Sequence, residues 1–213
     1  SAQEFLANGG TQISNLATDW VDAITRDGKT SLHSMSASGG SEKTTYRVSA
    51  NIKDVEGILN NTGYNQLNTR AAVSTSAMKD KLKIDFNLSY TKRDADLGDE
   101  RAFEFAQFYN PTAPIYGEDS LFQFNSAQYG GYFESLGLFR SYNPVSIIEQ
   151  TRNTRMSTNF NYNVNFNYSL SDSFDITVRA AEQRTTSRGQ MYRPTTLLFE
   201  GNAISPTRRG AAT

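Results

Sequence analysis

The sequence has no cysteine and only one histidine among its 213 residues. The absence of cysteine excludes disulfides and thiolate metal sites. A histidine-dependent triad would have to be built around His33, which lies in a serine-rich segment without a nearby carboxylate. Phosphate-binding and dinucleotide-binding glycine motifs are missing too. We therefore expect His33 to be a surface or interfacial residue, and we expect no catalytic residue, no enzyme activity and no cofactor.

Long hydrophobic runs and an excess of one charge are also missing. The formal net charge is −1, and no basic block indicates a nucleic-acid partner. No stretch approaches the ~18 consecutive apolar residues of a membrane-spanning helix. One explanation is a soluble protein; the other is a membrane β-barrel, whose alternating strands dilute hydropathy. The chain opens with Ser1 and shows no secretory leader, so the second explanation requires further sequence before it.

Residues 155–170 alternate strictly between two kinds of side chain. One parity is Met156, Thr158, Phe160, Tyr162, Val164, Phe166, Tyr168 and Leu170; the other is Arg155, Ser157, Asn159, Asn161, Asn163, Asn165, Asn167 and Ser169. A period of two predicts a β-strand whose faces meet opposite environments. The run is also longer than the roughly 3–10 residues of ordinary globular strands. It is typical of a wall between lipid and water or polar protein.

Weaker alternation elsewhere divides the chain into five parts. We expect an irregular lead-in at 1–30, four strands at 31–93, a long loop at 94–154, two strands at 155–187 and a loop at 188–213. Helical turns are expected at 2–6, 20–24 and 100–109, and a glycine turn at 39–41. Short and long connections alternate along the chain, as in outer-membrane barrels, where the long loops are extracellular.

The polar parity of these strands would pack poorly as the dry interior of a narrow barrel. We therefore predict an all-β fold that is part of a large antiparallel transmembrane β-barrel, with about six strands in this chain. Tyr46, Tyr64, Tyr90 and Tyr168 lie near strand ends and are expected at the membrane interfaces. The expected lipid-facing residues are Val48, Ile52, Ile84, Phe86, Phe160, Tyr162, Val164 and Phe166; the expected lumen-facing residues are Arg47, Asn51, Asn159, Asn161, Asn163 and Asn165.

The loop at 94–154 is the best candidate for recognition, because loops on a rigid scaffold commonly carry function. Its aromatic residues suit three alternative roles: stacking on a ligand, contacting a lid protein, or forming the loop's own core. Arg101, Arg140 and Arg152 are candidates to hold the loop through carboxylates. The aromatic candidates are Tyr116, Phe122, Phe124, Tyr129, Tyr132, Phe133, Phe139 and Tyr142.

Two further features leave alternatives open. Asp94 and Asp96 open an acidic stretch that is a weak candidate for Ca²⁺, against plain solvated acids. The asparagines of 159–167 either pave a carbohydrate path, because amides pair with sugar hydroxyls, or line a hydrated lumen or contact a plug. The rival to the barrel as a whole is a soluble β-sandwich adhesin or carbohydrate-binding surface module. In that rival, Phe160, Tyr162, Val164 and Phe166 would be buried against a second sheet.

Several segments resemble the SusC/RagA-type TonB-linked outer-membrane transporters of Bacteroidota. They are TDWVDAITRDG (18–28), SASGGSEKTTYRVSANIKDVEGIL (36–59), LKIDFNLSYTKRD (82–94), NPTAPIY (110–116), GGYFES (130–135) and YNPVSIIEQTRN (142–153), in the family's order and over most of the chain. The combination of SGGSEKTTY, NPTAPIY and NPVSIIEQ is the specific part of the match.

The resemblance implies a 22-stranded barrel with a plugged lumen, of which this chain is an early part. It implies a multi-pass location in the bacterial outer membrane, in contact with its lipid. The implied partners are a SusD-like surface lipoprotein lid and the TonB-ExbB-ExbD system, reached through a plug outside this chain. The implied activity is import of large nutrients, usually oligosaccharides and in some members peptides.

Overall fold

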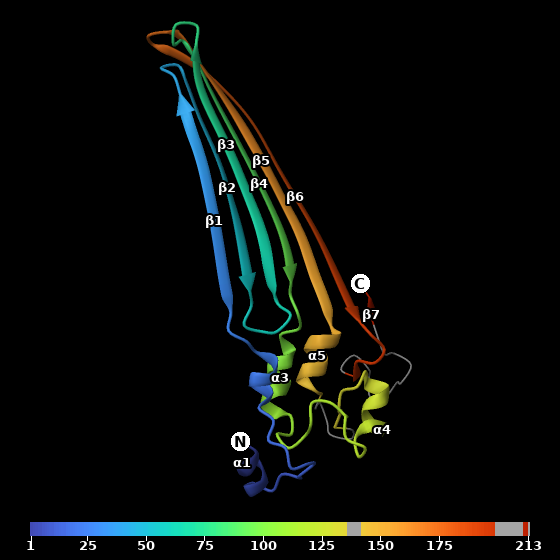
Figure 1. The fold of residues 1–213 in the computed structure, drawn as a ribbon. Coiled ribbons are helices and arrows are strands. Elements are labelled where there is room, and N and C mark those ends of the chain that lie inside the picture. The colour runs from blue at the N-terminus through green and yellow to red at the C-terminus, as the bar shows by residue number, and fades with distance from the viewer. Residues whose placement is uncertain (136–141, 199–210, 213) are drawn as a thin grey trace.

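The structure is a computed structural model that describes residues 1–135, 142–198 and 211–212. An antiparallel sheet forms the long part of the molecule, and a helical part lies at one end of it (Figure 1). The strands follow chain order in the sheet, so each long strand pairs with its sequence neighbours. The predicted fold class, an all-β chain with six long antiparallel strands, is confirmed.

The long strands are longer than the pattern predicted. β4 continues to Asp96, and β6 continues to Arg193, where a loop from residue 188 was expected. The strands are β1 (Lys29–Gly40), β2 (Thr44–Glu56), β3 (Gly63–Ala77), β4 (Leu82–Asp96), β5 (Arg152–Ser171), β6 (Phe174–Arg193) and β7 (Ala211–Ala212). The helices are α1 (Ala2–Ala7), α2 (Trp20–Ile24), α3 (Arg101–Phe108), α4 (Gln123–Ser126), the 3₁₀ turn η1 (Ala127–Tyr129) and α5 (Pro144–Gln150).

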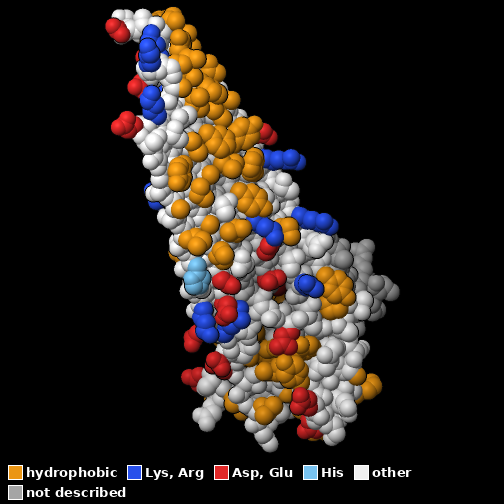
Figure 2. Space-filling model, turned by 45° about the horizontal axis from the view of Figure 1, so that its top comes forward, with side chains coloured by type: hydrophobic (Ala, Val, Ile, Leu, Met, Phe, Trp, Pro, Cys, Tyr) orange, Lys and Arg blue, Asp and Glu red, His pale blue; other side chains and the backbone are white. Residues whose placement is uncertain are grey.

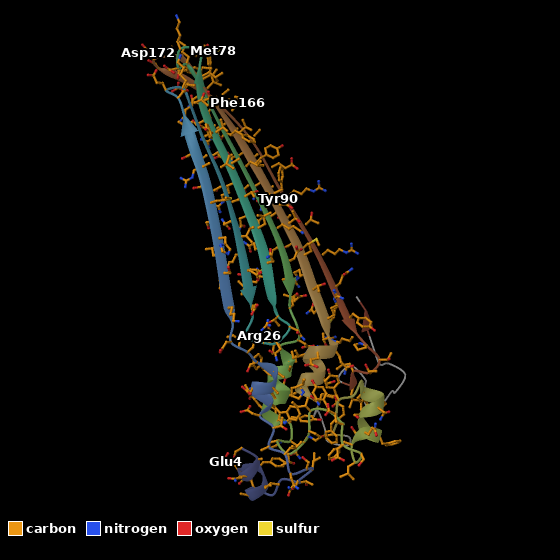
Figure 3. The ribbon with its side chains drawn as sticks, viewed as in Figure 1. Glu4, Arg26, Met78, Tyr90, Phe166 and Asp172 are labelled. Carbon is orange, nitrogen blue, oxygen red and sulfur yellow. The ribbon has the colours of Figure 1, made fainter. Side chains whose placement is uncertain are left out.

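All three tight connections lie at the end of the sheet away from the helices. Figure 3 places Met78 and Asp172, from two of these turns, together at that end. The predicted turn at 39–41 is wrong in detail: Gly39 and Gly40 are the last residues of β1. Neither has a positive φ. Glycine is needed at position 40 because a Cβ there would collide with the carbonyl oxygen of Thr44.

The strand register separates an apolar face from a polar face. Tyr46, Val73, Phe86, Val164 and Ala180 are aligned across β2 to β6 on the apolar face. Because side chains alternate, their neighbours along each strand form the polar face. The predicted position of Tyr64 at a membrane interface is wrong, because the parity of Tyr64 places its side chain on the polar face.

The helical part, which we call the cap, consists of residues 1–28 and the described residues between 97 and 151. Helices α2, α3 and α5 contact one another around a hydrophobic core. Trp20 anchors this core: its ring meets that of Tyr109 edge-on at 4.7 Å, and its indole N–H donates to the Asn110 carbonyl at 2.9 Å. No helix within residues 1–135, 142–198 and 211–212 is long and apolar enough to cross a membrane.

Candidate functional site

The polar face carries a network of amides and hydroxyls that runs across the strands. Asn68 Nδ2 donates to Asn51 Oδ1 at 2.7 Å, and the Thr91 hydroxyl donates to Asn68 Oδ1 at 2.8 Å. Asn87 Nδ2 donates to Asn163 Oδ1 at 3.1 Å. All six predicted lumen-facing residues lie on this face: Arg47, Asn51, Asn159, Asn161, Asn163 and Asn165. That the face borders a lumen stays a prediction.

Basic side chains also concentrate on the polar face. Toward the cap, the Arg93 guanidinium stacks 3.7 Å from the centre of the Tyr64 ring, and Lys53 Nζ lies 5.6 Å from it. This cation–π contact is the role of Tyr64 in place of the predicted interfacial one. Among the described strand residues, the basic side chains of this face are Lys53, Arg47, Arg70, Lys83, Arg93, Arg155, Arg179 and Arg193, and the acidic ones are Asp85 and Asp175.

No second sheet covers the apolar face in the described part of the chain. Val48, Ile52, Phe160 and Phe166 are exposed, although all are large and hydrophobic. Tyr162 and Val164 are half-buried by neighbours in their own sheet. Figure 2 shows hydrophobic side chains over the half of the sheet near the tight turns, giving way to charged ones toward the cap. The soluble sandwich is therefore not favoured, since it requires this face to be buried.

The boundary of the apolar zone runs diagonally across the sheet. The continuous apolar run on this face ends toward the cap at Ile52 on β2, Tyr90 on β4 and Ala180 on β6; beyond it on β6, Tyr192 stands alone after polar and charged residues. Ile52 is aligned through β3, β4 and β5 with Thr186, which lies six residues beyond Ala180. The boundary thus shifts ~20 Å along the strands over ~19 Å of sheet width. That slope, about 45°, is the tilt with which barrel strands cross a membrane.

The apolar zone also has the height of a membrane barrel. On β5 the uninterrupted apolar run extends from Phe160 to Leu170, and Thr158 separates it from Met156. Ten residues rise ~34 Å along a strand, and a tilt of about 40° leaves ~26 Å along the barrel axis. The apolar band of transmembrane barrels is about 25 Å tall.

Charged side chains occupy the same face between the apolar zone and the cap. Lys92 Nζ pairs with Asp94 Oδ2 at 2.9 Å, and Asp96 follows on the same parity. No group of three His, Cys, Asp or Glu side chains suited to a metal is found in the part of the chain that the structure describes. Ion pairing accounts for Asp94, and calcium binding by Asp94 and Asp96 stays an untested prediction. His33 is exposed near the Ser31 hydroxyl.

The aromatic candidates of the long loop divide into two groups. Tyr129, Tyr132 and Phe133 are buried, so they build the cap's own core. Phe122 packs edge-on against Phe133 at 5.2 Å, and Tyr142 meets Phe105 in the same way. Tyr116 and Phe124 are exposed, Phe124 at 92%. These two are the exposed ones among the described aromatic candidates, and contact of the candidates with a ligand or partner stays a prediction; Phe139 and Arg140 lie outside the described residues.

Two carboxylates hold the cap together in different ways. Asp99 accepts from Arg101 at 2.7 and 2.8 Å and from Arg193, at the end of β6, at 2.9 Å. Burial raises the pKa of Asp99, but these guanidiniums outweigh it and hold the pKa below its usual range. Glu134 is buried without a basic partner among the described residues, and burial raises its pKa to about 8. Its Oε2 accepts from the Asn143 backbone N–H at 3.0 Å.

An open groove of about 950 Å³ lies where the sheet meets the cap. Arg26, which Figure 3 places at this junction, lines it together with Asp96, Glu149, Arg152 and Arg188. Arg26 closes the β2–β3 connection by donating to the carbonyls of Gly57 and Thr62 at 3.1 and 3.0 Å. Sequence patterns did not predict this groove, because its residues come from six separate segments.

Solved structures share this arrangement of strands and cap. The structure of the RagAB peptide importer in the open-open state matches 95% of this chain and 22% of that chain, with a TM-score of 0.63 and 18% identity. The closed-closed state gives the same TM-score over 94% of this chain. At this identity the match defines the fold, which is that of part of a RagA-like chain.

Sequence comparison points to the same group. The TonB-dependent receptor SusC of Bacteroides thetaiotaomicron is 30% identical over 122 residues, 56% of this chain. The TonB-dependent receptor P26 of Formosa agariphila is 29% identical over 142 residues, 67% of this chain. No protein-family model matches. The chain spans only 12% and 13% of the length of these two relatives.

These matches confirm the resemblance that the sequence motifs predicted. The chain is similar, in sequence to SusC-type TonB-dependent receptors and in fold to RagA, over about a fifth or less of their length. The matched proteins are receptors and importers rather than enzymes.

Proposed function

We propose that this chain forms part of the wall of a TonB-dependent β-barrel that imports large nutrients across a bacterial outer membrane. The observation that carries the proposal is the diagonal apolar zone, ~26 Å tall, on the uncovered face of the sheet. A lipid bilayer accounts for both its height and its slope. A soluble surface module accounts for neither.

The orientation follows from the two ends of the sheet. Outer-membrane barrels have short periplasmic turns and long extracellular loops. The tight turns at one end of this sheet are therefore periplasmic, and the cap is extracellular. The polar face then borders the lumen, where water or a plug meets its amides and guanidiniums. A plug and its TonB contact would be supplied by sequence outside this chain.

The cap is the part that would meet a surface lipoprotein and incoming nutrient. RagAB is a complex of two proteins by name, and its likeness to this chain supports a lid partner of the SusD type. The side chains available for such a contact are Phe124, Leu121 and Phe108, which are the most exposed hydrophobic residues of the described cap. Large exposed apolar side chains mark interaction sites when they cluster.

Uptake in the native bacterium tests this function. The gene should be required for uptake of an oligosaccharide or peptide too large for porins, and uptake should stop when the proton gradient that drives TonB is collapsed. Detergent extraction from the outer-membrane fraction is the accompanying control. A protein found in the aqueous fraction, with uptake unchanged by deletion, would overturn the proposal.

A further inference from the structure

A hollow in the polar face brings two arginines together without any acidic partner. Arg47 on β2 and Arg70 on β3 both line a cavity of about 370 Å³, with Asn87, Asn161 and Asn163. Arg47 is aligned with Ala72, two residues from Arg70, so the two side chains are diagonal neighbours. Such neighbours have Cβ atoms about 7–8 Å apart, within reach of long side chains.

Two other basic residues of the polar face, Lys83 and Arg93, have partners within the chain, whereas Arg47 and Arg70 have none among the described residues. Lys83 lies 3.8 Å from Asp85, and Arg93 stacks on Tyr64. Arg47 and Arg70 are both exposed. Neither guanidinium has a carboxylate or hydrogen-bond partner in the described ranges 1–135, 142–198 and 211–212. Two adjacent like charges repel each other, so an anion between them would lower the free energy of the pair.

The neutral lining offers further hydrogen-bonding groups. Asn87 Nδ2 donates to Asn163 Oδ1, and Asn161 Nδ2 donates to the Ser89 hydroxyl at 3.3 Å. These bonds leave Asn163 Nδ2 and Asn161 Oδ1 without a partner among the described residues. A free amide donor and a free amide acceptor match the hydroxyl groups of a sugar. The guanidinium fork matches a carboxylate or sulfate in bidentate geometry.

We propose that the arginine hollow, formed by Arg47, Arg70 and the three asparagines, is a binding subsite for an anionic oligosaccharide on its way through the lumen. The proposal rests on the proposed function and narrows its substrate class to sugars that carry carboxylate or sulfate groups. Lysine and arginine side chains select anions when they line a pore. Ala71, Ala72 and Leu88 also line the hollow, so the sugar assignment rests on the free amide donor and acceptor beside the two guanidiniums, and an acidic peptide is the competitor that the experiment must separate.

Cations continue from the hollow toward the cap. Arg93 and Lys53 lie in the same cross-strand row. That row is four residues nearer the cap than the row of Arg70, and Arg155 lies one polar-face row nearer still. A stripe of one charge sign concentrates ligands of the opposite sign and steers their approach. The stripe therefore leads an anionic chain from the mouth toward the arginine hollow.

Calorimetric titration of the full-length receptor in detergent tests the proposal. The probes are a hexameric oligogalacturonate, a sulfated galactose oligomer of similar length, neutral maltohexaose and hexaglutamate. At least one anionic sugar should bind, with an affinity that falls with salt, and maltohexaose should bind at least about tenfold more weakly. Arg47→Gln and Arg70→Gln should each weaken binding about tenfold. Arg184→Gln, on the opposite face of the sheet, is the matched control and should change nothing.

The alternative outcomes are distinct. Equal binding of maltohexaose, or arginine variants that bind like wild type, would refute the anionic subsite. Tighter binding of hexaglutamate than of both anionic sugars would refute the sugar assignment. If the arginine variants make the plug sensitive to protease but keep their affinity for the anionic sugar, the arginines hold the plug instead. Outer-membrane insertion and uptake remain intact in each of these cases, so the proposed function stands or falls separately.

Discussion

An arginine placed on the apolar face should destabilise the protein only if that face meets lipid. Val164 lies near the middle of the apolar zone on β5, which runs from Phe160 to Leu170. An arginine at the midplane on the lipid side of a barrel costs about 2–4 kcal/mol, and the cost falls to about 0–1 kcal/mol near the interface. If the face meets lipid, Val164→Arg should therefore cost about 2–4 kcal/mol, because both neighbours along its face are apolar too.

Two matched variants isolate the cause. Asn163→Arg puts the same side chain on the polar face one residue away, and Thr158→Arg puts it on the apolar face beyond Phe160. Both should cost less than about 1 kcal/mol. The assay is urea unfolding of the full-length protein in lipid vesicles, followed by heat-modifiable mobility on gels. Equal losses for Val164→Arg and Asn163→Arg would refute the assignment of the two faces.

Three further predictions concern the cap. Trp20→Ala should cost about 3–5 kcal/mol in local stability, measured as faster hydrogen exchange in α2 and α3, and Trp20→Phe should cost less. Asp99→Asn should expose the end of β6 to chymotrypsin, because Arg193 loses a buried charged partner; wild-type cleavage rates would contradict this. Glu134 has its pKa raised in the folded cap, so its stabilising contribution is complete below pH ~4.5 and is lost as pH rises toward 8. Glu134→Gln should remove that loss, and an unchanged pH profile of proteolysis in the variant would contradict the assignment.

The strands were predictable because each side chain's environment is fixed by its parity. On β5 the alternation continues without a break from Met156 to Leu170, so both faces of the strand followed from sequence alone. Tyr64 differs because its place near a strand end indicates a membrane interface, whereas its parity puts it on the polar face. Its even position puts it beside Gln66 and Asn68 on β3, where Arg93 reaches its ring.

The cap was less predictable because its contacts are distant in sequence. Asp99 and Arg193 are 94 residues apart, and nothing local indicates their pairing. Helix α5 is short and buried nearly all round, so it shows no amphipathic period. It did have a local signal: Asn143 caps the helix and Pro144 occupies its first turn.

The burial of Tyr132 and Phe133 illustrates the same limit. An aromatic loop sequence does not reveal which rings face solvent, since that depends on which helices the loop packs against. Here α2, from the beginning of the chain, supplies Trp20 and Ile24 to the core that the loop aromatics complete. Phe124 belongs to the same aromatic loop as Tyr132 and Phe133, yet its side chain is almost fully exposed.

Spin labels placed one at a time along residues 159–167 of the full-length protein in vesicles test the central claim most directly. Collisions with oxygen, which concentrates in lipid, and with a water-soluble nickel chelate should alternate with period two. Labels at 160, 162, 164 and 166 should collide more often with oxygen. Labels at 159, 161, 163 and 165 should collide more often with the nickel chelate or be shielded from both reagents. Uniform protection of the even positions from both reagents would mean that the apolar face is buried in protein, and the membrane wall would be refuted.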